Sequence, residues 1–178
     1  MIRFVFAVVA VVAVAALIAP AQADDPINIP FPIVQTAFKK GECSIELKDE
    51  PREEVQDLDG GLKLVEIYCW RAAYQAGSIF LAVDPKAPAN ARLLQFHEWS
   101  DRKNALIVVT ALSNPGFDPA TKIMSAGHKG RGVGDCGTAA EWKWTGRDFM
   151  LLRYWIKEKC DGEPFDNDRK WQVYPPRR

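Results

Sequence analysis

The sequence lacks an excess of charge of either sign. It contains 23 lysine and arginine residues against 23 aspartate and glutamate residues, so the formal net charge at pH 7 is zero. A nucleic-acid-binding domain normally carries a basic excess on one face, and an acidic disordered segment carries a surplus of negative charge. Neither class is expected here, and nucleic acid is not a predicted partner.

Motifs for catalysis and metal binding are also scarce. The chain has two histidines, His97 and His128, and no cysteines in the C-x₂₋₄-C spacing of a zinc site. The G-x-S-x-G motif is absent, and Ser125 lies outside any nucleophile elbow. We therefore predict no cofactor and no metal. The alternative that remains is a hydrolase acting on envelope material, with His97 or His128 as the general base.

Long hydrophobic runs are confined to the start of the chain. Residues 1–3 supply a positive start, residues 4–18 are apolar, and residues 21–23 (AQA) form a small-x-small cleavage site. We predict a signal peptide over residues 1–23 and a mature chain that is periplasmic or secreted. Pro20 interrupts the run before the roughly 20 apolar residues that a membrane span needs, so no stable span is expected after signal removal. A monomer is the default expectation.

Four cysteines follow the predicted cleavage site, and an even number in an exported chain favours two disulfides. Three pairings are possible. We favour Cys43 with Cys69 and Cys136 with Cys160, because each pair brackets one compact stretch of alternating pattern. Closing a loop of about 25 residues stabilises a fold by roughly 3 to 4 kcal/mol in the chain-entropy model.

The hydrophobic pattern is typical of an all-β domain. Short apolar runs alternate with polar turns, which predicts an antiparallel sandwich or barrel over residues 42–178. A proline-rich N-terminal arm covers residues 24–41 and includes one short helix at 33–40, whereas the acidic segment 49–61 is expected to be a solvated loop. The expected strands are residues 62–69, 78–83, 91–99 and 105–110.

The clearest predicted hairpin covers residues 139–156, with Thr145-Gly146 as a two-residue turn. This register places Trp142 opposite Phe149. It also places Cys136 opposite Trp155 instead of Cys160, so a bulge or a strand bend is needed to close the second disulfide.

Five sequence blocks stand out along the chain, namely GRGVGDCG at residues 130–137, EWKWTGRDFML at 141–151, CDG at 160–162, YCWRAAYQ at 68–75 and FDPAT at 117–121. Together they resemble an uncharacterised family of exported proteobacterial proteins, one of the domains of unknown function. The resemblance implies an exported, β-rich domain with disulfides, similar to the C-terminal half of longer members, and it implies no biochemical activity.

Three further patterns have a functional and a structural interpretation. Residues 132–137 (GVGDCG) fit a dinucleotide-binding motif, but a strand-like segment follows them, which favours a glycine-rich turn. The acidic segments 57–60 and 161–168 contain calcium-type ligands, yet aspartate and glycine are also ordinary turn residues. Glu141 and Glu163 form a glycosidase pair only if the fold gives them the required separation.

Aromatic residues give the last indication of function. Packing in a β core is the favoured role for the tryptophans. If one patch is exposed, we expect it to contain Arg131, Trp142 and Trp144. The leading hypothesis is an exported, non-catalytic domain that binds a protein or glycan in the cell envelope, with inhibition of a secreted hydrolase as its sharper form. A third possibility is a structural module that has no ligand of its own.

Overall fold

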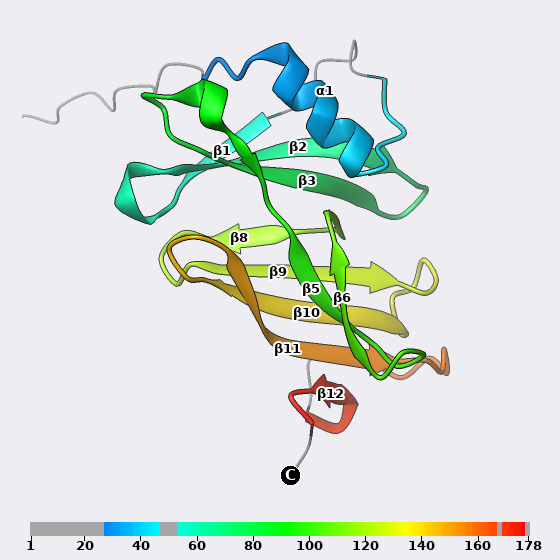
Figure 1. Cartoon of the computed structure of the whole chain (residues 1–178). Coiled ribbons are helices and arrows are strands. Elements are labelled where there is room, and N and C mark those ends of the chain that lie inside the picture. Colours follow the sequence, from blue (N-terminus) through cyan, green and yellow to red (C-terminus); the bar gives the residue numbers. More distant parts are fainter. Residues whose placement is uncertain (1–26, 47–52, 167–168, 177–178) are drawn as a thin grey trace, which may run out of the picture.

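The computed structural model describes residues 27–46, 53–166 and 169–176, which form two five-stranded antiparallel sheets, a separate two-stranded ribbon and one α-helix (Figure 1). The prediction of an all-β fold with one short helix is therefore confirmed, and the described strands do not close into a barrel. Within these residues no helix has the length and apolar character needed to cross a bilayer.

The first sheet has the strand order β1-β2-β3-β4, with β7 also paired to β3. Figure 1 shows α1 lying over β2 and β3. Because one face of this sheet packs against α1 and the other faces the second sheet, β3 is almost continuously buried. The elements are α1 (Phe31–Lys40), β1 (Glu53–Asp57), β2 (Lys63–Arg71), β3 (Ala76–Val83), β4 (Arg92–Leu93) and β7 (Ala111–Ser113).

The helix α1 packs its apolar side on the first sheet. Val34, Ala37 and Phe38 are buried in one cluster with the outward-facing side chains of β2 and β3, including Ile67 and Ile79. A proline in the first helical turn is compatible with the helix start, since that turn has no backbone partner to lose. The predicted helix is thus present and begins two residues earlier than expected.

Strand β1 corrects the prediction of a loop at 49–61. Residues 53–57 pair with β2, with Glu53 opposite Ile67 and Asp57 opposite Lys63. Acidic residues are common on edge strands, where they discourage pairing with another chain. The acidic composition of residues 53–57 is therefore that of an edge strand and not of a loop. Residues 47–52 lie outside the described part of the chain.

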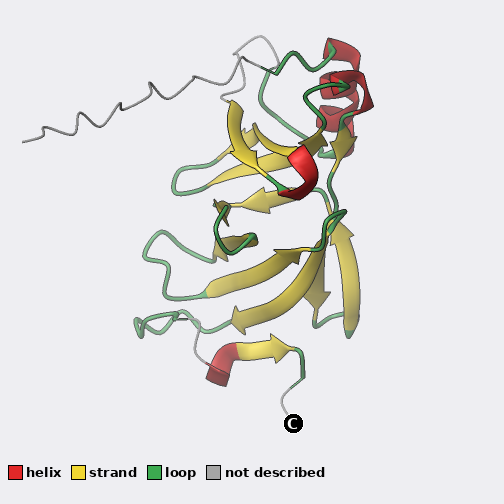
Figure 2. Cartoon of the chain, turned by 90° about the vertical axis from the view of Figure 1, so that its left-hand side faces the viewer, coloured by secondary structure: helices red, strands yellow, loops and turns green. Residues whose placement is uncertain are grey.

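The second sheet has the strand order β12-β11-β10-β9-β8, and the ribbon β5–β6 lies across its inner face (Figures 1 and 2). Residues from this face pack with β5 and with the first sheet in one large core. The elements are β5 (Phe96–Ser100), β6 (Ala105–Val109), β8 (Gly116–Asp118), β9 (Ile123–Lys129), β10 (Gly137–Trp144), β11 (Phe149–Lys157) and β12 (Gln172–Tyr174).

The β10–β11 hairpin forms as predicted, but with a different register. Trp144 lies opposite Phe149, so the loop has four residues, Thr145 to Asp148, instead of two. The backbone N–H of Thr145 donates to the Asp148 carbonyl, and the N–H of Asp148 donates to Thr145 Oγ1. The Thr145 hydroxyl oxygen thereby accepts a hydrogen bond from the Asp148 N–H, a backbone donor that would pair with the opposite strand in a two-residue turn.

A β-bulge then shifts the pairing between Glu141 and Trp142. As a result Gly137 lies opposite Lys157, which brings Cys136 close enough to bond to Cys160. The Cα atoms of this pair are 4.9 Å apart.

The structure contains both disulfides expected from the sequence. Cys43 bonds to Cys69, which ties the segment after α1 to β2, and Cys136 bonds to Cys160 at the end of the β10–β11 hairpin. No free cysteine occurs in the described chain. Disulfides persist in oxidising environments, so this pair of crosslinks indicates a location outside the cytosol.

Candidate functional site

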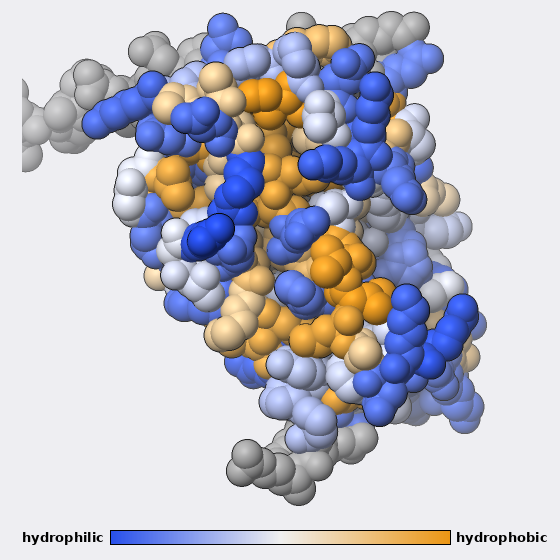
Figure 3. All heavy atoms as spheres, in the orientation of Figure 1, coloured by the Kyte–Doolittle hydropathy of each residue, from blue (hydrophilic) through white to orange (hydrophobic). Residues whose placement is uncertain are grey.

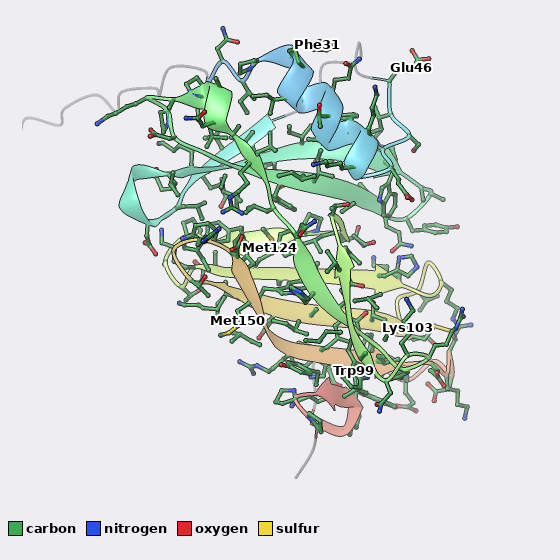
Figure 4. The ribbon with its side chains drawn as sticks, in the orientation of Figure 1. Phe31, Glu46, Trp99, Lys103, Met124 and Met150 are labelled. Atoms are coloured by element: carbon green, nitrogen blue, oxygen red, sulfur yellow. A yellow bond between two sulfur atoms is a disulfide. The ribbon has the colours of Figure 1, made fainter. Side chains whose placement is uncertain are left out.

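The inner face of the second sheet carries large aromatic side chains at one end and mostly small or polar side chains at the other. At the hairpin-loop end Trp142, Trp144 and Phe149 are buried, and Phe96 of β5 packs on them, with its ring centroid 5.4 Å from that of Trp142. Figure 4 shows Met124 in the space between the sheets, at the same end. These large side chains fill the interior as a close-packed core.

At the other end of the same strands the inward positions carry small or polar side chains. Strand register places Ala140 beside Ala126 and Thr138 beside His128, with Tyr154 next to Ala140 on β11. Because alanines cannot fill the distance to the opposite elements, a cleft of about 310 Å³ remains.

The cleft lies between this end of the sheet and the chain segment that runs from β6 into β7. Val109, Ala111 and Ser113 line one wall, and Glu98 from β5 completes the lining. The surface that lines the cleft is about equally polar and apolar, so several polar groups converge beside alanine and valine walls, as in small-ligand sites.

Glu98 is the carboxyl group in this cleft. The Tyr154 hydroxyl is 3.5 Å from Glu98 Oε2, at the long limit of a hydrogen bond. Burial raises the pKa of Glu98 above its usual value, because the charged form loses hydration. Burial, followed by the nearby Glu98 charge, raises the pKa of Tyr154 to about 12, and the Thr138 hydroxyl acts in the opposite direction.

The two histidines occupy different places. His128 Nδ1 is 3.5 Å from Ser113 Oγ, and both residues line the cleft. His97 lies on the exposed side of β5, outside the lining, and its backbone carbonyl accepts a 2.7 Å hydrogen bond from Trp142 Nε1. Of the two histidines considered from the sequence, the structure brings only His128 to this cleft.

The exposed patch of Arg131, Trp142 and Trp144 does not form. The two tryptophans are 0% and 3% exposed because they face the core side of β10 and not the solvent. Arg131 lies apart from them in the turn before β10, where its guanidinium pairs with Asp135. Core filling, the favoured role of these tryptophans, is what the structure contains.

The glycine-rich segment is a turn that supports the second disulfide. Gly137 has a φ of 136°, and a Cβ there would lie 1.9 Å from the His128 carbonyl oxygen, so only glycine fits. Asp135 is buried and accepts hydrogen bonds from Arg131 and from the Gly162 N–H. The Arg131 guanidinium holds the pKa of Asp135 well below its usual range.

Four of the acidic groups considered as calcium or glycosidase residues have basic partners, whereas Asp166 is exposed and Asp168 lies outside the described residues. Asp57 pairs with Lys63 at 2.9 Å, Asp59 with Lys122 at 3.7 Å, Asp161 with Lys157 at 2.6 Å, and Glu141 with Arg153 at 3.3 Å. Glu163 is exposed in the segment after β11. Asp135 lies beside Cys136 and Cys160, but both sulfurs are in the disulfide and offer no thiolate to a metal.

Comparison with known families gives a match over almost the whole chain. The model of a family described as "Protein of unknown function (DUF1176)" matches residues 6–176. The chain belongs to this family. Membership assigns no activity, since the family description itself gives none.

A curated relative extends this result. The chain is 30% identical over 125 residues to "Uncharacterized protein YpfG" of Escherichia coli (strain K12), a match that covers 67% of this chain and 34% of the relative. The chain therefore corresponds to about a third of the length of that protein. No solved structure matches this chain.

Sequence reasoning missed four residues of the cleft, namely Glu98, Ser113, Thr138 and Tyr154. One signal was present: Glu98 alternates with His97 and therefore shares a face with Phe96, a core residue. A carboxyl group at an inward-facing strand position is unusual enough to mark a site. Ser113, Thr138 and Tyr154 lie in segments whose sequence pattern indicates only a β-strand. Their hydroxyl groups come together through the pairing of these strands, which the sequence does not show.

Proposed function

We propose that this chain is a non-catalytic binding domain that holds part of an envelope protein or glycan in the cleft between β5–β7 and the second sheet. The observation that carries this proposal is the composition of the cleft. Its alanine and valine walls offer apolar contacts, and the carboxyl and hydroxyl groups of Glu98, Tyr154 and Thr138 give it directional polar contacts.

The proposal includes the route by which the domain reaches its ligand. Residues 1–23 act as a signal peptide, residues 24–41 form an N-terminal arm, and residues 42–178 form the disulfide-bonded domain that works in the periplasm or after secretion. The two disulfides support this location, because they would not persist in a reducing cytosol.

An inhibitor of a secreted hydrolase is the sharper form of the proposal. Strand β6 has Val109 in the cleft, and its outward side chains Leu106 and Val108 are 41% and 54% exposed. Figure 3 shows hydrophobic side chains gathered over this part of the molecule. Exposed apolar residues beside a cleft are typical of a protein-binding surface.

The test uses a variant in which the cleft is filled. Ala126→Leu adds a larger side chain at a lining position, and Ala89→Leu makes the same change at an exposed position outside the lining. We expect envelope protein and peptidoglycan fractions to raise the melting temperature of the wild-type and Ala89→Leu chains, but not that of Ala126→Leu. Equal stabilisation of all three chains would reject the cleft as the binding site.

One observation favours a hydrolase as the second candidate function. The contact between Ser113 Oγ and His128 Nδ1 places a nucleophile and a base in the same cleft. Release of a chromophore from ester or glycoside substrates by the wild-type chain, abolished in Ser113→Ala and in His128→Gln, would establish this activity and overturn the non-catalytic proposal. Turnover that is absent, or that survives both substitutions, would reject the pair as catalytic residues.

A further inference from the structure

The Glu98 carboxylate is a charged group without a cationic partner in the cleft. Its hydrogen-bond partner among the described residues is Tyr154 at 3.5 Å, and no salt bridge within this part of the chain includes it. The described residues that line the cleft include no lysine or arginine. Placing a carboxylate in such surroundings costs free energy unless a cation or several donors satisfy it.

Two other acidic groups of the molecule, Asp135 and Asp161, do have cationic partners. Asp135, which is more deeply buried than Glu98, accepts hydrogen bonds from Arg131 and from a backbone N–H. Asp161 pairs with the buried Lys157 at 2.6 Å. These two carboxylates have a cationic partner within the fold, whereas no lysine or arginine lines the cleft beside Glu98, so a ligand can supply its cation.

The remaining lining defines the shape of the matching group. Val109, Ala111, Ala126 and Ala140 offer apolar walls along the cleft, and the Trp142 and Tyr154 rings also belong to its lining. Aliphatic carbons pack on such walls, whereas the faces of aromatic rings attract a cation. An uncharged sugar ring could bond to the hydroxyl groups of the lining but would leave the Glu98 carboxylate without a cation.

We propose that the cleft binds the ammonium end of an aliphatic amine, such as the side chain of a lysine presented by an envelope protein or peptide, with Glu98 as its counter-ion. The Tyr154 hydroxyl contacts the Glu98 carboxylate and is itself contacted by the Thr138 hydroxyl, and the alanine and valine walls lie along the aliphatic stem. This inference rests on the proposed function, because it names the chemistry of the ligand for that same cleft.

Binding of an ammonium ion has a thermodynamic signature. Burial raises the pKa of Glu98 in the empty cleft and a bound cation lowers it, so lysine binding releases a proton from Glu98 at pH values near the carboxyl pKa and none well above it. Tyr154 and His128 are the other titratable side chains of the lining, and Asp101 acts on Tyr154 from the turn after β5. Proton release that persists in His128→Gln therefore excludes His128 as its source.

The experiment is calorimetric titration of the mature chain with Nα-acetyl-lysine amide, with Nα-acetyl-norleucine amide, which lacks the ammonium group, and with glucosamine. We expect the lysine compound to bind at least about tenfold more tightly than the norleucine compound at about pH 8, where the carboxyl is ionised, since a charged hydrogen-bonded contact is worth roughly that factor or more. In a series of titrations at lower pH, the binding enthalpy should depend on the ionisation enthalpy of the buffer over the range in which Glu98 titrates. Glu98→Gln should lose this preference while keeping its fold, as judged by near-UV circular dichroism.

The outcomes separate the inference from the proposed function. Equal affinity for the lysine and norleucine compounds, or an unchanged lysine preference in Glu98→Gln, overturns the ammonium assignment but leaves the cleft as a binding site. Tighter binding of glucosamine than of the lysine amide overturns the aliphatic assignment in favour of an amino sugar. If Ala126→Leu still responds to envelope fractions like the wild type, the cleft itself is rejected.

Discussion

The two ends of the β10–β11 hairpin are stabilised by different means. At the loop end Trp142, Trp144 and Phe149 are packed against Phe96, and ring centroids lie 5.2 to 5.4 Å apart. At the cleft end the inward side chains are small apart from Tyr154, so less aromatic surface packs against β5 than at the loop end.

The cleft end has covalent and ionic contacts in place of packing. The Cys136–Cys160 disulfide closes this end of the hairpin, and Asp135 links Arg131 to the backbone of Gly162. Lys157, also fully buried, bonds to Asp161 and to the Glu163 carbonyl. A cleft can stay open for a ligand here because these contacts hold the strands without filling the space between them.

The largest effect is expected from a cavity at the aromatic end. Trp142→Ala should lower the free energy of unfolding by about 3 to 5 kcal/mol, because it removes a fully buried ring and its hydrogen bond to the His97 carbonyl. Urea denaturation followed by circular dichroism measures the loss. Met150→Ala on the outer face, where the side chain is 56% exposed, is the control and should change stability by under about 0.5 kcal/mol.

Removal of the Cys136–Cys160 disulfide is expected to have the next largest effect. The double substitution of both cysteines by serine should cost about 2 to 4 kcal/mol. The Cys43–Cys69 pair closes a loop of similar length, with a separation of 26 residues against 24, so its removal should cost a similar amount by chain entropy.

The two double variants should differ in the cleft. Only loss of the Cys136–Cys160 bond should also weaken ligand-induced stabilisation, because it is the one of the two disulfides that lies at the cleft end of β10 and β11. Equal effects of both variants on ligand binding would contradict the assignment of the Cys136–Cys160 disulfide to the support of the cleft.

Acid should weaken the cleft end through Asp135. The pKa of this carboxyl is lowered in the folded chain, so its stabilising contribution is fully present above its ordinary pKa and is lost as the pH falls through the folded value. Asp135→Asn should therefore be less stable than the wild type at neutral pH, and the two should converge in strong acid. Thermal unfolding at a series of pH values tests this convergence; a gap that does not depend on pH would contradict it.

The smallest effect is expected at Glu98, with the opposite sign. Its pKa is raised in the folded chain, so the protonated carboxyl favours folding at low pH and this contribution is lost as the pH rises through the folded value. Glu98→Gln should gain stability relative to the wild type as the pH increases, without a ligand present. Parallel pH profiles of the two chains would show that Glu98 is not held in an unfavourable site.

Much of the scaffold was predictable because its signals are local. Alternation of apolar residues predicted β2, and short apolar runs predicted β3 and β6, whereas the single strand predicted at 91–99 is divided into β4 and β5. Cysteine parity in a chain with a predicted signal peptide predicted the two disulfides. The predictions were wrong for segments whose backbone groups could form hydrogen bonds with more than one partner. Residues 53–57 look like an acidic loop and become a strand because β2 offers them an open edge. Thr145 extends its turn because its own hydroxyl caps the loop.

The sequence by itself determined the class of fold, the crosslinks, and the presence of enough aromatic residues for a core. Only the tertiary structure decided which tryptophans are covered and which polar residues meet. Glu98, Ser113, His128, Thr138 and Tyr154 come from five different strands, and strand register and the crossing of β5–β6 over the second sheet bring them to one cleft. The physical reason is that side-chain alternation fixes the face on which a residue lies, whereas long-range pairing between strands fixes its neighbours.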